Sequence, residues 1–163
     1  MGKSATYRYI GIDPGKSGGI TVIDTKDGSM EAVKCPERTI DMATMFYSFV
    51  GDEPNNVRLL MEKVWARPNN ATRSAFTYGV NYGQWLGIAA AAEVPMYTVI
   101  PSAWMTAIGC KKGMDYSERK KWLKAKAQKL YPNTKVTLYT ADSILIAHYG
   151  KETFFDEISS EDA

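Results

Sequence analysis

The sequence predicts a single α/β domain with a mixed five-stranded sheet flanked by helices. Three observations lead to this fold class. The 163 residues are 45% hydrophobic and 23% charged, which is typical of one globular domain with its own core. Three strand-like segments follow one another near the N-terminus, and strand-like and helix-like segments alternate after them. We place the domain at residues 1–150 and expect the acidic segment 151–163 to be a flexible tail.

The first three segments predict an antiparallel meander. The expected strands are residues 8–13, 18–24 and 30–34. Pro14-Gly15 and Asp27-Gly28 are turn signals at the ends of the first two strands. Because both connections are short, the three strands should be neighbours in one sheet.

The rest of the chain predicts five helices and two more strands. These are helices 40–50, 74–92, 117–130 and 141–149, a short helix from Pro101, and strands 59–62 and 96–100. The expected core residues of the first helix are Ile40, Ala43, Met45, Phe46, Phe49 and Val50. Ser117 is the expected N-cap of its helix, and Pro95 ends the long helix before it. Leu59-Leu60-Met61 has the composition of a buried central strand.

Composition argues against a secreted or membrane protein. Cys35 and Cys110 form no CxxC pair, so both should be free thiols in a reducing compartment. The chain begins without a secretory leader, and its apolar runs are too short to cross a bilayer. We therefore expect a cytoplasmic or otherwise intracellular protein with no membrane partner.

The net charge of +2 hides a marked asymmetry. Residues 151–163 have one lysine against five acidic residues, a net charge of −4, so residues 1–150 have +6. Eight lysines and arginines fall within residues 111–129, against two acids. Such a stretch is typical either of a phosphate-binding surface or of a solvated helix face.

Three carboxylates lie at the edges of apolar elements. Asp13 ends the first strand, Glu62 ends the strand before the long loop, and Asp142 lies in the first turn of the last helix. Each also has an ordinary explanation. Asp13 could begin a turn, and Glu62 could pair with Arg58 or Lys63. Asp142 could be an acid that the helix dipole favours in the first turn. The apolar face that Asp142 shares favours an inward position instead.

Inward acids without partners repel one another and tend to take up protons. Mg²⁺ or Mn²⁺ relieves this repulsion, because both ions prefer oxygen ligands. A pair of such ions can activate water and stabilise the leaving oxygen of a phosphodiester. The pattern therefore favours metal-dependent phosphodiester hydrolysis.

The motifs around these acids resemble the RuvC family of Holliday junction resolvases, within the RNase H-like superfamily. They are Gly11-Ile12-Asp13-Pro14-Gly15 with Ser17-Gly18-Gly19, Met61-Glu62-Lys63-Val64, and Ala141-Asp142-Ser143-Ile144-Leu145-Ile146-Ala147. The resemblance covers about residues 8–150. Its middle part, from Phe76 through Gly79, Gly83 and Gly87 to Pro101-Ser102-Ala103-Trp104, is most similar to the phage and viral branch.

The resemblance implies an RNase H-like homodimer that cuts four-way DNA junctions by paired hydrolysis. Asp13, Glu62 and Asp142 would be the catalytic metal ligands, holding two Mg²⁺ ions for which Mn²⁺ can substitute. The family usually has a further acid three or four residues before the last one. This chain has Tyr139 and Leu138 there, so a fourth ligand is missing.

Other family features also differ. Ser143 or His148 could serve as weak additional ligands, although a structural role is the simpler explanation for His148. The family often has a basic residue directly after the tryptophan, where this chain has Met105. Lys111 or Lys112 could substitute for it.

The resemblance also suggests residues that bind DNA. Trp65 would stack on unpaired bases near the crossover, and Arg67 and Arg73 would grip phosphates. The alternatives are a core tryptophan and ordinary loop solubility. The basic stretch adds further phosphate-binding candidates, which are Lys111, Lys112, Arg119, Lys120, Lys121 and Lys124.

Small residues four apart form a stripe on the long helix. They are Gly79, Gly83, Gly87 and Ala91. The stripe could pack on the chain's own sheet, or it could form the dimer interface that the resemblance implies.

Two other functions remain open. One is an RNase H-like nuclease for other branched DNA or for RNA. The other is a junction-binding protein with weak or no cleavage, which the missing fourth acid suggests. A fragment of an actin-like sugar kinase is excluded by length, because that fold needs two such domains.

Overall fold

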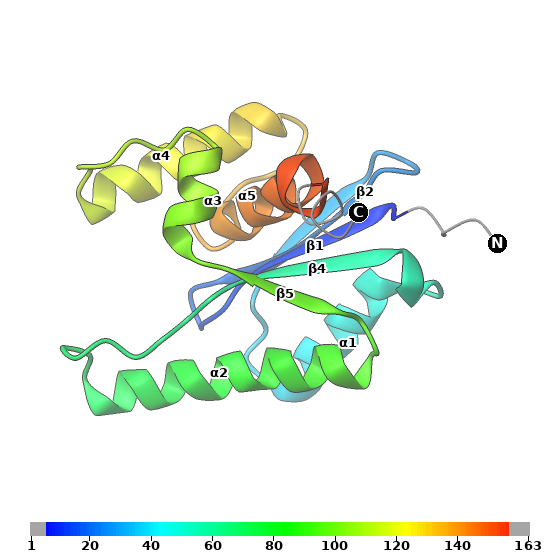
Figure 1. The fold of residues 1–163 in the computed structure, drawn as a ribbon, viewed down its shortest axis with the longest axis horizontal. Helices are drawn as coiled ribbons and strands as arrows, with labels where there is room; N and C mark the ends of the chain where they lie inside the picture. Colours follow the sequence, from blue (N-terminus) through cyan, green and yellow to red (C-terminus); the bar gives the residue numbers. More distant parts are fainter. Residues whose placement is uncertain (1–5, 157–163) are drawn as a thin grey trace.

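The computed structural model describes residues 6–156, which form a five-stranded mixed sheet with helices on both faces (Figure 1). The strands are β1 (Arg8–Asp13), β2 (Gly19–Asp24), β3 (Met30–Lys34), β4 (Val57–Glu62) and β5 (Met96–Val99). The helices are α1 (Thr39–Val50), α2 (Thr72–Ala91), α3 (Pro101–Ala107), α4 (Tyr116–Leu130) and α5 (Ala141–Tyr149), with the short helices η1 (Pro54–Asn56) and η2 (Gly150–Phe154). The predicted fold class is confirmed.

The sheet has the strand order β3-β2-β1-β4-β5. β1, β2 and β3 form the predicted antiparallel meander, whereas β4 runs parallel to β1 and β5 runs parallel to β4. Ile12 is level with Met61 in the register of β1 and β4. The residues that follow these two positions, Asp13 and Glu62, therefore leave the sheet at the same edge.

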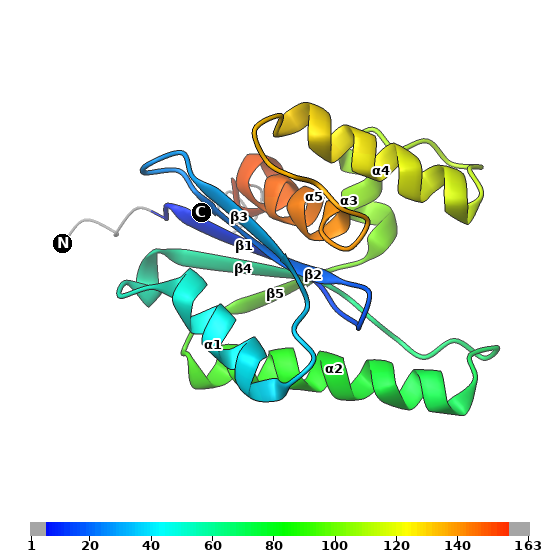
Figure 2. The ribbon, with the colours of Figure 1, turned by 180° about the vertical axis from the view of Figure 1, so that it is seen from behind.

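Helices cover the two faces of the sheet and create two cores. Figure 2 shows α1 and α2 on one face and α3, α4 and α5 on the other. The first core contains Ile10, Ile12, Leu59 and Met61 of the strands with Phe46 and Trp85 of the helices. The second contains Leu60 and Val99 with Trp104, Leu123, Ile144 and Leu145. Leu59 and Met61 point to one face and Leu60 to the other, which explains the continuous apolar run of β4.

Helix α5 lies unusually close to the strands. A Cβ atom on Gly11 would come within 2.4 Å of backbone atoms of Ser143 and Ala147, and one on Gly19 would come within 2.6 Å of the Tyr139 carbonyl oxygen. The hydroxyls of Thr21 and Ser143 are also hydrogen-bonded at 2.8 Å. Glycine at these two strand positions is therefore what lets the helix carrying Asp142 approach the sheet.

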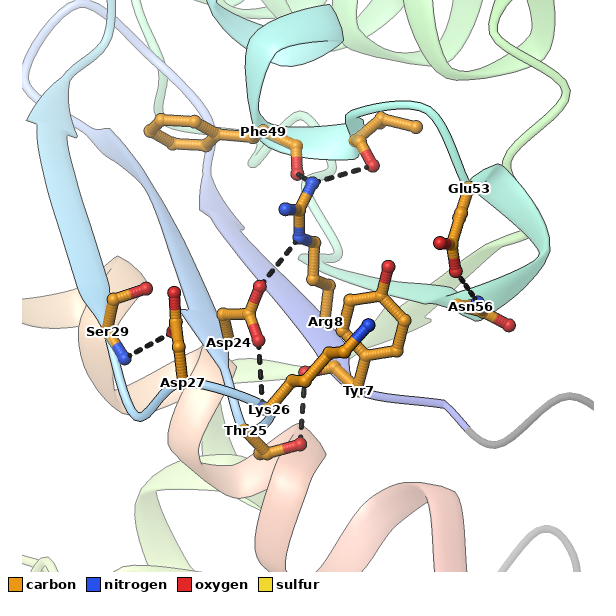
Figure 3. Close-up of polar contacts among 11 residues, drawn as sticks. Tyr7, Arg8, Asp24, Thr25, Lys26, Asp27, Ser29, Phe49, Glu53 and Asn56 are labelled. Carbon is orange, nitrogen blue, oxygen red and sulfur yellow. Dashed lines mark hydrogen bonds and ion pairs between the residues drawn. The ribbon is translucent and has the colours of Figure 1, made fainter.

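A polar network joins the opposite edge of the sheet to α1 (Figure 3). The Arg8 guanidinium donates to the Asp24 carboxylate at 2.9 Å and to the Val50 carbonyl at 3.0 Å. The carboxylate of Asp24 also accepts from the Lys26 amide at 2.9 Å. Asp24 is buried, and these partners compensate its desolvation.

Two local predictions were wrong. Ile40 is 65% exposed, and Met42 takes the buried position that we did not assign. The cap of α4 is Asp115, not Ser117: Asp115 accepts from the Glu118 amide, and Glu118 accepts from the Asp115 amide. This reciprocal capping box satisfies two amide groups and outcompetes a serine two residues further on.

The domain extends beyond residue 150. Helix η2 continues α5, and Phe155 is buried with its ring 6.0 Å from that of Tyr9 and 5.4 Å from that of Tyr97. The first part of the segment that we expected to be flexible is thus packed on the sheet. The rest, residues 157–163, lies outside the described residues.

Cys35 and Cys110 are free thiols, as predicted. Within residues 6–156, no helix has both the length and the apolar character that crossing a membrane requires.

Candidate active site

The three predicted carboxylates line one cleft. Its volume is about 850 Å³, and Asp13, Glu62 and Asp142 contribute to its wall. Asp13 and Glu62 arrive from the ends of the parallel strands β1 and β4, and Asp142 arrives from the first turn of α5. Two strands and a helix that are distant in sequence therefore bring their acids to the same edge of the sheet.

Helix α2 holds the turn after Asp13. The Gly15 amide donates to the Asn81 side chain at 2.8 Å, and the Tyr78 ring lies against Gly15. Gly15 has a φ of 114°, a conformation that residues with a side chain rarely adopt. The turn that ends β1 is thus fixed by contacts across the molecule as well as by Pro14.

Glu62 is held by a tryptophan. The Trp104 indole N–H donates to the Glu62 carboxylate at 2.8 Å, and Trp104 is fully buried. The alternative that we expected, an ion pair of Glu62 with Arg58 or Lys63, is not seen in the described chain. The sequence indicates Trp104 only as part of a motif, so its contact with Glu62 is a feature of the candidate site that sequence reasoning missed.

Burial and the neighbouring negative charges make Asp13 and Glu62 hard to ionise. Burial raises the pKa of Asp13 well above its usual value, and the charges of Asp142 and Glu62 raise it further. Burial raises the pKa of Glu62 to about 7, although the hydrogen bond from Trp104 opposes this. Asp24, in contrast, is paired with Arg8. In the described chain, Asp13 and Glu62 lack the cationic partner that normally accompanies a buried carboxylate.

Lys120 provides part of the charge compensation that the buried Asp142 requires. The Lys120 ammonium is in contact with Oδ2 of Asp142, while the buried Oδ1 has no hydrogen-bond partner. Burial alone would lower the pKa of Lys120, but the charge and hydrogen bond of Asp142 raise it overall. Lys120 was predicted as a DNA contact, and its pairing with Asp142 was not foreseen.

The chemistry of the three acids suits a divalent cation, but their side chains are not arranged to coordinate one. The repulsion between Asp13, Glu62 and Asp142 and the unpartnered Asp142 oxygen are both relieved by a cation with oxygen ligands. Among residues 6–156, however, no three acid, histidine or cysteine side chains are already clustered tightly enough to coordinate an ion. Coordination would need the acidic side chains to move closer together.

Ser143 and His148 are poor candidates for additional ligands. The Ser143 hydroxyl is buried and bonded to Thr21 and to the Thr140 carbonyl. The His148 ring is bonded to the Tyr131 hydroxyl at 2.8 Å, and burial lowers its pKa. Neither residue lines the cleft, which supports the structural explanation for His148.

Basic side chains from opposite faces of the sheet surround the acids. The cleft walls include Arg67 and Arg73 on one side and Arg119, Lys120 and Lys121 on the other. Figure 1 shows why: the N-terminal ends of α2 and α4 project on the same side of the molecule, below and above the sheet.

Three predicted lysines lie elsewhere, and several cleft residues were not predicted. Lys111, Lys112 and Lys124 are exposed but do not line the cleft, whereas Lys120 and Lys121 do. The cleft residues that we did not single out are Lys16, Ser74, Thr77, Tyr78 and Tyr116. Several fall in segments that the sequence marks only as helix ends, which is why no local signal identified them.

Trp65 is not a core residue. It is 50% exposed and lines a smaller pocket of about 300 Å³ beside the cleft, together with Glu62 and Arg67. An indole left in solvent next to a carboxylate site is available to stack on a flat ligand.

The glycine stripe faces solvent. Gly79, Gly83 and Gly87 are exposed, and a Cβ atom on any of them would meet nothing within 4 Å. Packing on the chain's own sheet is therefore excluded. The same side of α2 exposes Phe76, Val80 and Leu86.

The fold is shared with a known group of solved structures. One is a Thermus thermophilus RuvC "in complex with Holliday junction substrate", with 19% identity, a TM-score of 0.56, and coverage of 90% of this chain and 96% of that one. Another, also from Thermus thermophilus RuvC, has 18% identity, a TM-score of 0.50, and coverage of 87% and 94%. No protein-family model matches the sequence, and no curated protein matches it. The chain thus has a RuvC-like, RNase H-like fold, while the predicted phage and viral branch remains a prediction.

Proposed function

We propose that this protein is a divalent-metal-dependent endonuclease that resolves four-way DNA junctions. The observation that carries the proposal is the convergence of Asp13, Glu62 and Asp142 in one cleft between basic walls. A phosphodiester needs both features, because basic side chains attract the backbone and carboxylates hold the cation that acts on it. The RuvC-like fold supports the choice of branched DNA, since one structural neighbour is in complex with a Holliday junction.

In the proposed mechanism, Asp13, Glu62 and Asp142 bind Mg²⁺, for which Mn²⁺ can substitute. Bound there, the metal would polarise the scissile phosphate and lower the pKa of a water nucleophile. Trp104 keeps one Glu62 oxygen in place, so the other is free to face the cleft. The raised pKa of Glu62 means that it must lose its proton as it takes up the cation.

Arg67 and Arg73 would bind the DNA backbone on one side of the scissile phosphate, and Lys121 on the other. These contacts supply affinity and not sequence choice. Trp65 would stack on a base beside the cut, because its ring is exposed next to Glu62. Stacking of this kind contributes roughly 1–3 kcal/mol.

We further propose that the exposed stripe of Gly79, Gly83 and Gly87 is the interface of a homodimer. Glycine lets two helix backbones approach closely, and the neighbouring Phe76 and Val80 supply apolar area. A two-fold dimer would present two active sites to a junction, which fits paired cleavage.

A second candidate function is junction binding with little or no cleavage. Leu138 and Tyr139 line the cleft where the resembled family usually has a further acid. In addition, the three acids are not clustered for coordination. Both observations are compatible with a site that binds the cation weakly.

Incubation of the purified protein with a labelled four-way junction and the matching linear duplex separates these functions. Each is tested with Mg²⁺, Mn²⁺ or EDTA. Paired symmetric nicks in the junction alone, lost with EDTA, would support the resolvase. Tight junction binding without cuts in either metal would support the binding protein, and equal cutting of the duplex would contradict both.

A further inference from the structure

Lys120 contacts one of the carboxylates that the proposed cation would use. It extends from the first turns of α4 to α5, and its ammonium contacts Oδ2 of Asp142. The side chains are 24% and 5% exposed, so the pair is largely removed from solvent. Within the described chain, no other ion pair includes a carboxylate of the cleft.

The charge of the site explains why an ammonium is held there. Asp142 is buried near Asp13 and Glu62, and its negative charge raises the pKa of both of these acids. One lysine provides a single compensating charge without a metal ion. The other oxygen of Asp142, Oδ1, still lacks a partner, so this compensation is incomplete.

An ammonium on Oδ2 opposes a divalent ion at Asp142, even if the ion binds the unpartnered Oδ1, because two positive charges at one carboxylate repel each other. Metal uptake is therefore favoured when Lys120 moves away. The freed ammonium would still face the cleft, beside Lys121 and Arg119, where a DNA phosphate can receive it.

We propose that Lys120 is a resident counter-ion of the metal site, displaced when metal binds and then transferred to a DNA phosphate. The inference rests on the proposed function in taking Asp142 as a metal ligand. It has a specific consequence: DNA that attracts Lys120 raises the affinity for metal, and metal raises the affinity for DNA by the same factor.

The test is Mn²⁺ binding to the DNA-free protein, measured by isothermal titration calorimetry. Lys120→Met removes the competing charge, so its affinity for Mn²⁺ should increase by roughly tenfold or more. Lys120→Arg keeps the charge and should remain near wild type. Lys129→Met is the matched control, because Lys129 is exposed at the far end of the same helix.

A second neutral variant guards against misfolding. Lys120→Gln retains a hydrogen-bond donor for Asp142 and should show the same gain, and circular dichroism checks the fold of each variant. Unchanged or weaker Mn²⁺ binding in a folded Lys120→Met or Lys120→Gln protein overturns the inference. So does a complete absence of Mn²⁺ binding in the wild type and both variants.

Junction cleavage by the wild type tells this failure apart from failure of the proposed function. Cleavage with unchanged Mn²⁺ affinity in the neutral variants would leave the nuclease standing and remove only the role of Lys120. No cleavage and no Mn²⁺ binding would remove both.

Discussion

The acidic residues of the cleft differ from the buried Asp24 because they lack a full set of charged and hydrogen-bonding partners. Asp24 is buried beside Arg8 and accepts two hydrogen bonds, so its position needs no function. Asp142 shares one oxygen with Lys120 and leaves the other unpartnered, and Asp13 has its pKa raised by its own burial and its acidic neighbours. Native proteins rarely retain such groups without a use for them.

Asp13→Asn should abolish cleavage and leave junction binding intact. The amide has the shape of the carboxylate but no negative charge, so it is a poor metal ligand and still fits the buried site. We expect cleavage of a labelled junction to fall on the order of a hundredfold or more, with binding in EDTA nearly unchanged. Loss of binding by a protein that still folds would argue against a metal-binding role.

Trp104→Phe should weaken metal binding through Glu62. Phenylalanine fills much of the space but cannot donate the 2.8 Å hydrogen bond, so the carboxylate loses its fixed orientation. We expect Mn²⁺ affinity to fall by about tenfold, as for other residues that orient ligands. The same loss should raise the pKa of Glu62 further and move the pH–rate profile to higher pH. Trp122→Phe on α4 serves as the control, and equal behaviour of the two variants would assign Trp104 to packing alone.

At the scale of elements, two helices contribute different surfaces to the same molecule. The N-terminal end of α4 brings Lys120 and Lys121 to the cleft. The α2 helix brings Arg73 to the cleft at its first turn and exposes glycines along its outer side. No charged residue occurs between Arg73 and Glu93, so this outer side lacks the polar cover of a solvated helix.

Gly83→Leu should convert a dimer into a monomer. A Cβ atom there meets nothing within 4 Å and Gly83 is exposed, so folding should be unaffected, whereas a closely packed helix pair could not accommodate a leucine. Sedimentation velocity measures the change. Ala125→Leu, at an exposed position of α4, is the matched control. A dimer that persists in Gly83→Leu would contradict the proposed interface.

At the scale of the whole molecule, repulsion between the cleft acids should lower the stability of the fold. Their repulsion is built into the junction of β1, β4 and α5, the elements that also organise both cores. The metal-free fold is therefore expected to be less stable than its cores alone would allow. Binding of the cation should restore the stability that the repulsion removes.

Stability of the metal-free protein should decrease as the pH rises from about 4.5 to about 7. Glu62 titrates near 4.5 when unfolded and near 7 when folded, so the folded state binds more protons in this window. Stability is then lost with increasing pH, by at most about 3 kcal/mol for this group, and Asp13 acts in the same direction. Urea unfolding in EDTA at pH 5 and pH 7 measures the effect.

Glu62→Gln should flatten that dependence, because the amide does not titrate. Glu37→Gln, on an exposed segment, should leave it unchanged. A wild-type protein that becomes more stable between pH 5 and pH 7 would show that the cleft acids are better compensated than their burial indicates.

The sequence by itself determined the fold class, the order of the elements and the three acids at their edges. These features are local: alternation of polarity, turn residues and apolar runs depend on neighbours in the chain. The exposure of Ile40 and the Asp115 cap were missed, because several nearby residues satisfy the same local rule.

Only the tertiary structure decided which residues meet at the site. The contacts of Lys120 with Asp142 and of Trp104 with Glu62 join residues 22 and 42 positions apart, and no sequence periodicity records such pairs. The exposure of Trp65 and of the glycine stripe was likewise open, because composition does not distinguish a buried position from a solvent-facing one. The physical reason is that a side chain's partners depend on how the strands and helices pack against one another, whereas its element depends mainly on its neighbours in the chain.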